Sequence, residues 1–109
     1  MTQPVFLMGL PRTGATFLHH LMNKDETNRT PRMWELAYPV PPPDPATYTN
    51  NPRIAQTHHD LKRLFDSHVD LEHAHYMEAE EPEDCEFIFG RTLLNPHFLL
   101  QYPAASFAE

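Results

Sequence analysis

Two glycines near the amino end bracket a short loop whose residues could bind an anion. Residues 9–16 read GLPRTGAT, with the glycine spacing of the phosphate-binding loop G-x-x-x-x-G-K-[ST]. In such a loop consecutive backbone N–H groups face inward, and the positive end of the following helix attracts phosphate or sulfate. Ala15 replaces the lysine, and the cation stands inside the loop as Arg12. The clamp on the β and γ phosphates that a kinase needs is therefore missing.

Glu35 and His75 are the two candidates for a general base. Glu35 lies between Trp34 and Tyr38, whose rings would desolvate it and make it a better proton acceptor. His75 is the other candidate, because imidazole titrates near neutral pH. Two simpler interpretations remain open for Glu35, a salt bridge to Arg32 or exposure to solvent. A bystander role remains open for His75, because the chain has eight histidines.

The other titratable residues predict neither a metal site nor a thiol nucleophile. The histidines include the pair His73 and His75, but they show no consistent three-ligand spacing, so we expect no metal. Cys85 stands among acidic residues, which disfavour a thiolate. The acidic residues 78–86 are interpreted as a solvated loop followed by the start of a helix.

The elements that must position these residues begin with a strand. Residues 5–8, VFLM, form an apolar run typical of a strand buried on both faces of a parallel sheet. After the loop, apolar residues at helical spacing predict a helix over residues 14–23. A strand, a glycine-bracketed loop and a helix in this order are the arrangement that anion binding requires.

The rest of the chain predicts two further helices and a proline segment. Residues 39–45, PVPPPDP, are expected to be extended, neither helix nor central strand. Asn51 followed by Pro52 predicts the start of a helix over residues 52–72. A further helix is expected over residues 82–89, before Gly90. Beyond residue 95 the chain is expected to be irregular.

Composition excludes several classes of protein. The 109 residues carry a net charge of −7, which argues against a nucleic-acid partner. A single cysteine excludes internal disulfide bonds and fits a reducing, cytoplasmic location. No apolar run approaches the length of a membrane span. One confident strand is too little for a sheet, so the chain is expected to be the opening part of a larger α/β domain.

Three blocks of the sequence together resemble the sulfotransferases that use 3′-phosphoadenosine-5′-phosphosulfate (PAPS). Residues 4–16, PVFLMGLPRTGAT, resemble the loop that holds the 5′-phosphosulfate in that family. The resemblance continues through residues 33–43, MWELAYPVPPP, and resumes at His75 and residues 82–86, PEDCE, a pattern of the bacterial-type branch. One departure is Ala15, where the family usually has threonine, and the change removes a hydroxyl but keeps the backbone N–H.

The resemblance implies a fold, a reaction and roles for residues. The fold would be α/β of the P-loop-NTPase-like kind, with an incomplete sheet in this chain. The reaction would transfer a sulfuryl group from PAPS, the co-substrate, to the hydroxyl or amine of a small-molecule acceptor without a metal. Arg12 would stabilise charge on the phosphosulfate, and Glu35 or His75 would act as the base. The residues implied to bind the donor are Pro11, Arg12, Thr13, Gly14, Ala15 and Thr16.

The resemblance also implies what this chain lacks. In that family the contacts to the 3′-phosphate and adenine come from a later segment, so we expect residues 1–109 to be the N-terminal portion of a single sulfotransferase domain, inactive alone. Two alternatives remain open: a P-loop nucleotide-binding, kinase-like protein, and a non-catalytic truncated fragment or interaction module with an exposed sheet edge. The sequence is compatible with a homo-oligomer and does not identify the acceptor.

Overall fold

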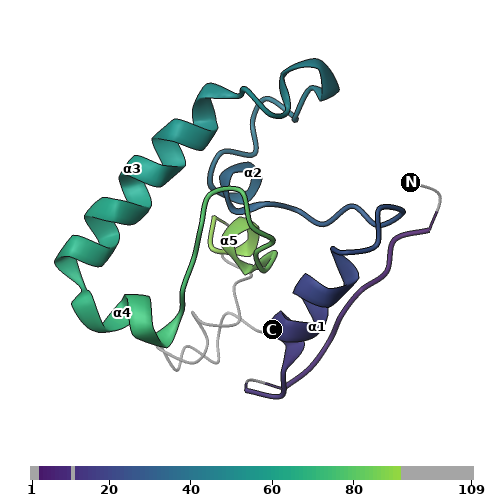
Figure 1. Cartoon of the computed structure of the whole chain (residues 1–109), viewed down its shortest axis with the longest axis horizontal. Helices are drawn as coiled ribbons and strands as arrows, with labels where there is room; N and C mark the ends of the chain where they lie inside the picture. The colour runs from purple at the N-terminus through teal and green to yellow at the C-terminus, as the bar shows by residue number, and fades with distance from the viewer. Residues whose placement is uncertain (1–2, 11, 92–109) are drawn as a thin grey trace, which may run out of the picture.

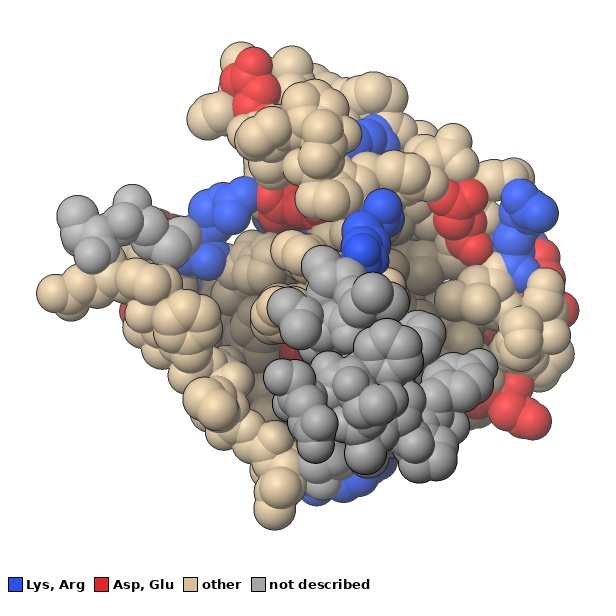
Figure 2. All heavy atoms as spheres, turned by 180° about the vertical axis from the view of Figure 1, so that it is seen from behind, with Lys and Arg blue, Asp and Glu red and all other residues tan. Residues whose placement is uncertain are grey.

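The computed structural model describes residues 3–10 and 12–91, and the regular structure in this part is helical (Figure 1). The α-helices are α1 (Ala15–Met22), α2 (Met33–Ala37), α3 (Pro52–Ser67), α4 (Val69–Ala74) and α5 (Glu86–Phe89), and a 3-10 helix, Pro45–Thr47, precedes α3. None of these helices is both long enough and apolar enough to cross a bilayer. Acidic and basic side chains are interspersed on the face that Figure 2 shows.

The strand expected over residues 5–8 is not formed. The described residues contain no β-strand, only an isolated antiparallel bridge between Arg32 and Pro82. Val5, Phe6 and Met8 are 68%, 80% and 93% exposed. A strand needs a neighbour to pair its N–H and C=O groups and to cover its faces, and no described segment provides one here. The sheet part of the predicted fold is therefore not confirmed.

The helix predicted after the loop is confirmed as α1, although its apolar face is not buried. Gly14 is the N-cap, and the helix ends at Met22. Phe17, Leu18 and Leu21, which share the helical spacing, remain exposed. Local sequence therefore determines the helix, whereas no described element covers it.

The core forms around α2, a helix that the sequence did not predict. Trp34 and Leu36 are almost completely buried, and Met33 packs with Leu61 of α3 and Met77. Partly buried side chains from neighbouring segments surround this cluster: Ala37, Phe65, Leu71 and Phe87. The hydroxyl of Tyr38, at the end of α2, also donates a hydrogen bond to Asp60 of α3.

A distant segment holds the amino end of α2. The backbone N–H of Met33 donates to the carbonyl of Glu81 at 3.0 Å, and that of Trp34 donates to Ala79 at 3.0 Å. Two residues beyond Glu81, Glu83 N–H donates to the carbonyl of Pro31 at 3.1 Å. First-turn N–H groups have no partner within their own helix, so residues 79–83 satisfy groups that would otherwise be left unpaired.

The helix predicted over residues 52–72 is two helices. As predicted, Asn51 is the N-cap, its side chain accepting from Arg53 N–H at 3.1 Å, and Pro52 is the first helical residue. The helix is interrupted at His68, whose N–H bonds back to the last turn of α3, and α4 follows at an angle (Figure 1). This change of direction lets Leu71 pack against the core.

The predictions for the remaining segments are partly confirmed. Residues 39–44 form neither helix nor strand, as expected, but Pro45 opens the 3-10 helix. The last helix begins at Glu86 instead of residue 82, because the backbone at residues 81–83 is bonded to the segment that enters α2. Gly90 follows it as predicted. The region expected to be irregular beyond residue 95 lies outside the described residues.

Candidate functional site

The loop before α1 turns through two residues in the left-handed region. Arg12 has a φ of 65° and Gly14 a φ of 90°. Between them, the Thr13 hydroxyl donates to the carbonyl of Leu10 at 2.6 Å. A Cβ on Gly9 would lie 3.0 Å from that same hydroxyl oxygen, so the first glycine makes room for the turn, while the second supplies the backbone conformation.

The backbone N–H groups that follow Arg12, and the Arg12 guanidinium, are free for a ligand. The N–H groups of residues 13–16 and the Arg12 guanidinium make no hydrogen bond or ion pair with another described residue. All of these residues are exposed. Left-handed turns gather successive N–H groups into an anion-binding concavity, which here lies at the positive end of α1. Pro11 lies outside the described residues.

Glu35 is a buried carboxylate held by three donors. Its side chain is 7% exposed. One oxygen accepts from the guanidinium of Arg29, and the other accepts from the backbone N–H of Arg32 and the hydroxyl of Tyr48, each at 2.9 Å. A salt bridge of Glu35 is therefore confirmed, but its partner is Arg29 and not the predicted Arg32.

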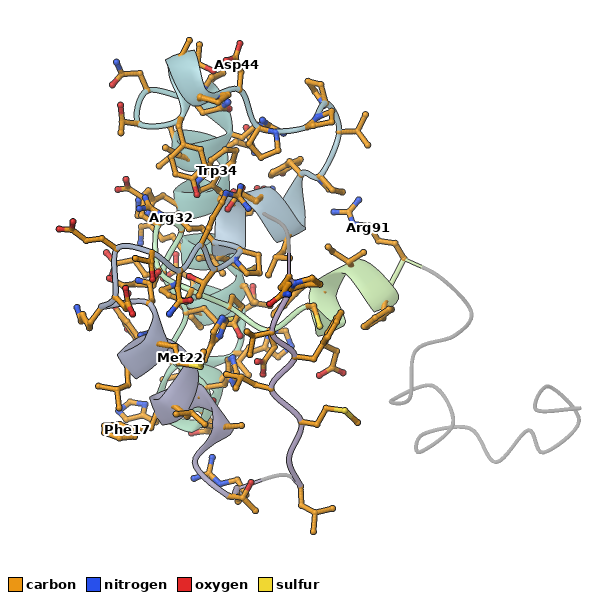
Figure 3. The ribbon with its side chains drawn as sticks, turned by 90° about the vertical axis from the view of Figure 1, so that its right-hand side faces the viewer. Phe17, Met22, Arg32, Trp34, Asp44 and Arg91 are labelled. Atoms are coloured by element: carbon orange, nitrogen blue, oxygen red, sulfur yellow. The ribbon has the colours of Figure 1, made fainter. Side chains whose placement is uncertain are left out.

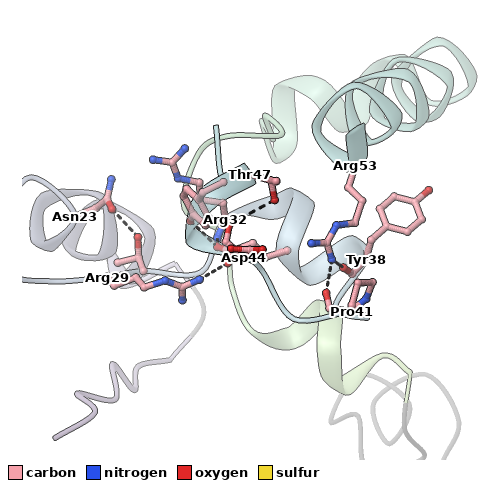
Figure 4. A network of polar contacts seen from close by, with 11 residues as sticks. Asn23, Arg29, Arg32, Tyr38, Pro41, Asp44, Thr47 and Arg53 are labelled. Atoms are coloured by element: carbon pink, nitrogen blue, oxygen red, sulfur yellow. Dashed lines mark hydrogen bonds and ion pairs between the residues drawn. The ribbon is translucent and has the colours of Figure 1, made fainter. Parts of the chain in front are cut away.

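The connection between α1 and α2 positions Arg29. The side chain of Asn28 donates to the carbonyl of Met22 at 3.1 Å, and the Thr30 hydroxyl donates to Asn23 at 2.6 Å. Both bonds fasten the residues flanking Arg29 to the carboxyl end of α1, and Figure 4 shows the one made by Asn23. Arg29 therefore reaches Glu35 from a tethered backbone.

Tyr48 joins this ion pair to the core. Its ring meets that of Trp34 edge-on at 5.3 Å, and the guanidinium carbons of Arg29 and Arg32 lie 5.7 and 5.1 Å from its centroid. Burial, together with the hydrogen bond to Glu35, raises the pKa of the Tyr48 phenol above its ordinary value. The phenol is therefore a hydrogen-bond donor at neutral pH.

A cleft of about 380 Å³ opens beside Tyr48. Its lining comes from the end of α1, the connection to α2 and the proline segment, and includes Asn23, Arg29, Arg32, Pro43, Pro45 and Tyr48. Figure 4 shows Arg29 and Arg32 beside the turn that carries Asp44 and Thr47. The cleft is large enough for a small molecule.

His75 belongs to a different pair. Its Nε2 lies 3.1 Å from a carboxylate oxygen of Glu83, a buried residue whose N–H donates to Pro31. A smaller cleft of about 210 Å³ lies nearby and is lined by Glu83 and by His20 and Glu81, which lie 3.6 Å apart. The sequence predicted His75 as a candidate but not its acidic partner.

A comparison with known protein families identifies the family of the chain that carries these sites. The model of the sulfotransferase family matches residues 4–108. The chain belongs to the sulfotransferase family. No curated protein and no solved structure matched it. The match covers the loop, both candidate bases and residues 38–48 of the chain, and the family implies a P-loop-like fold.

The structure does not bring the predicted catalytic residues together. The loop that carries Arg12 lies at the amino end of α1, and Glu35 lies beyond the other end, in α2 (Figures 1 and 3). In Figure 3, Phe17 marks the lower end of α1 and Arg32 lies well above it. None of the contacts made by Glu35 or His75 involves Arg12.

The sequence did not predict that Arg29 and Tyr48 bind Glu35. Arg29 stands six residues before Glu35, and Tyr48 thirteen residues after it. Arg29 had a usable signal, since a glutamate shortly after two arginines is a candidate ion pair. Tyr48 had none, because the path of the proline segment places it against α2. Within the described residues no three metal-ligating side chains lie together, and Cys85 is an exposed free thiol.

Proposed function

We propose that this sulfotransferase takes its sulfuryl group from PAPS and that the loop at residues 9–16 holds the 5′-phosphosulfate. The observation that carries the proposal is the loop itself, in which Arg12 and Gly14 adopt left-handed turns and the N–H groups of residues 13–16 have no other described partner. A phosphosulfate offers several oxygens to such donors. The absence of lysine at Ala15 favours this ligand over the triphosphate of a nucleotide.

Arg12 stabilises the charge that moves during transfer. The acceptor oxygen forms a bond to sulfur, and the bond between sulfur and the bridging phosphate oxygen breaks. The leaving adenosine bisphosphate keeps the bonding electron pair, so negative charge grows on its phosphate. A guanidinium can bind two of these oxygens at once, and charge stabilisation of this kind is often the largest contribution to catalysis.

Glu35 takes the proton of the acceptor hydroxyl in this proposal. It is buried, it is held in one orientation by three donors, and its Tyr48 partner lines the larger cleft. His75 is the alternative base, and its Nε2 is already engaged by Glu83. A pH–rate profile separates the two: the limb on the acidic side, where the rate rises as the base loses its proton, should disappear in Glu35→Gln and remain in His75→Ala. The opposite result would assign the base to His75.

The donor loop and Glu35 must meet at one sulfur atom for transfer to occur. They stand at opposite ends of α1, which spans 8 residues, or about 12 Å at 1.5 Å per residue. The loop must therefore lie closer to α2 in the reacting complex than it does in this structure.

Calorimetry with the whole chain tests donor binding. PAPS should bind without a metal, and Arg12→Ala should weaken it by about 10- to 100-fold, since hydrogen bonds to charged groups contribute about 1.5–3 kcal/mol. Lys24→Ala, which removes a cation beyond the other end of α1, is the matched control and should change little. Tighter, Mg²⁺-dependent binding of ATP would instead favour the kinase-like alternative.

A further inference from the structure

The larger cleft carries a charge that nothing in the described chain neutralises well. Its lining includes Arg29 and Arg32 and no carboxylate. Arg29 is paired with Glu35, which lies behind it. The ion-pair contact of Arg32 is a long one, 3.9 Å to Glu80, which is itself half exposed, and such contacts contribute little. The cleft is thus a locally cationic site on a chain whose net charge is −7.

The same cleft offers flat apolar surface. The ring of Tyr48 and the side chains of Pro43 and Pro45 contribute to its lining. The Tyr48 ring packs edge-on against Trp34, and the guanidinium groups of Arg29 and Arg32 lie over it. Apolar walls with a few fixed polar groups are typical of sites for small organic molecules. The body of a ligand would pack on these walls while an anionic group meets Arg32.

The cleft also leads to the candidate base. Tyr48 lines it, and the hydroxyl of this residue donates to Glu35 at 2.9 Å. A ligand hydroxyl that bonds to the Tyr48 oxygen is therefore one hydrogen bond away from the Glu35 carboxylate. The cleft combines a place for a hydroxyl, a place for an anion and a surface for the body between them.

We propose that this cleft is the acceptor site and that the acceptor is acidic: a small molecule with a carboxylate or similar oxyanion, held by Arg32, in addition to the hydroxyl that is sulfated. The identification of this ligand as the sulfuryl acceptor rests on the proposed function. The anion preference of the cleft does not depend on that function and can be measured separately from donor binding.

Paired probes test this preference. 4-Hydroxybenzoate carries the carboxylate, and 4-hydroxybenzamide is its neutral counterpart of nearly the same shape. Trp34 is the only tryptophan and touches Tyr48, so its fluorescence reports occupation of the cleft. We expect the carboxylate to bind about tenfold more tightly than the amide, as a charge-assisted contact predicts.

Three variants assign the preference to the cleft. Arg32→Gln should abolish it, Arg32→Lys should retain part of it, and Lys62→Gln, which removes an exposed cation on α3, should leave it unchanged. Circular dichroism checks that each variant is folded, and the lysine variant keeps the test valid if the glutamine variant is not.

Several results would overturn the proposal. These are equal affinities for the two probes, no fluorescence change with either at millimolar concentration, or a preference that survives Arg32→Gln. Loss of the preference in Arg12→Ala would assign the anion to the loop and overturn it as well. Calorimetry with PAPS on the same proteins shows separately whether donor binding fails.

Discussion

The amino-terminal region, residues 3–22, leaves its apolar side chains exposed, whereas the core around α2 buries them. In the first region, Leu10 and Phe17 are largely exposed, and no described element covers α1. Around α2, Trp34 and Leu36 are almost fully buried, and a segment 45 residues or more away in sequence satisfies the first N–H groups of the helix. The region that carries the ligand motif is thus poorly packed. The residues expected to bind a ligand and the residues that stabilise the fold therefore lie in different parts of the chain.

The largest expected effect is on the free energy of unfolding, when one leucine in each region is replaced by alanine. Leu36→Ala should lower the free energy of unfolding by about 2–5 kcal/mol, because it leaves a cavity in the core. Leu10→Ala should change it by about 0.5 kcal/mol or less, because Leu10 is 76% exposed whereas Leu36 is 2% exposed. Urea denaturation followed by circular dichroism measures both. Equal losses would show that the amino-terminal region is as well packed as the core.

The second prediction concerns Gly14, where function and stability should separate. A Cβ there meets no atom within 4 Å, but the φ of 90° strains any other residue. Gly14→Ala should therefore weaken PAPS binding by about tenfold, the equivalent of about 1–2 kcal/mol of left-handed strain. The melting temperature should stay near that of the parent chain. A large fall in melting temperature with unchanged affinity would reverse these assignments.

A smaller effect is expected in the alkaline stability of the core. The pKa of Tyr48 is raised in the folded chain, chiefly by burial and then by Glu35, so its neutral form is favoured by folding. The resulting stabilisation is complete below the unfolded pKa of about 10 and is lost as pH rises through the folded pKa. Asp60 and Glu78 also raise the pKa values of Tyr38 and Tyr76, so Tyr48→Phe should remove one tyrosine's share of the late tyrosinate absorbance and leave the rest. If that variant keeps all of the late absorbance, Tyr48 does not contribute to it.

The smallest expected effect is a movement of the loop. With Cys85 changed to serine and the exposed Leu10 to cysteine, a dye at position 10, outside the donors of residues 13–16, can accept energy from Trp34. PAPS should increase the transfer efficiency, because the sulfur held by the loop must approach Glu35. A dye on Lys62→Cys in the same background is the control and should report no change. Unchanged transfer at saturating PAPS would contradict a shared reaction centre for the loop and Glu35.

Local signals in the sequence predicted the elements that local interactions determine. The helix after the loop, the start of α3 at Asn51 and Pro52, and the glycine after α5 are all as predicted. Each depends on helical spacing, a cap or a glycine within a few residues. The family was also recognisable, because its motifs are contiguous stretches of sequence.

Elements that depend on distant contacts could not be predicted in this way. The amino end of α2 is held by Ala79 and Glu81, and the interruption at His68 lets Leu71 reach the core. The strand over residues 5–8 needs a neighbour that the described residues do not supply. That the chain is the N-terminal portion of a longer domain stays a prediction, and so do the roles of Arg12, Glu35 and His75.

The most direct test of the account is to observe the loop amides while PAPS is added. In a ¹⁵N–¹H correlation spectrum of the whole chain, the signals of Thr13, Gly14, Ala15 and Thr16 should shift with saturation, without Mg²⁺. In Arg12→Ala the same shifts should need about 10- to 100-fold more PAPS. Unmoved loop signals at saturating PAPS, or shifts confined to residues around α2, would contradict the claim that this loop binds the phosphosulfate.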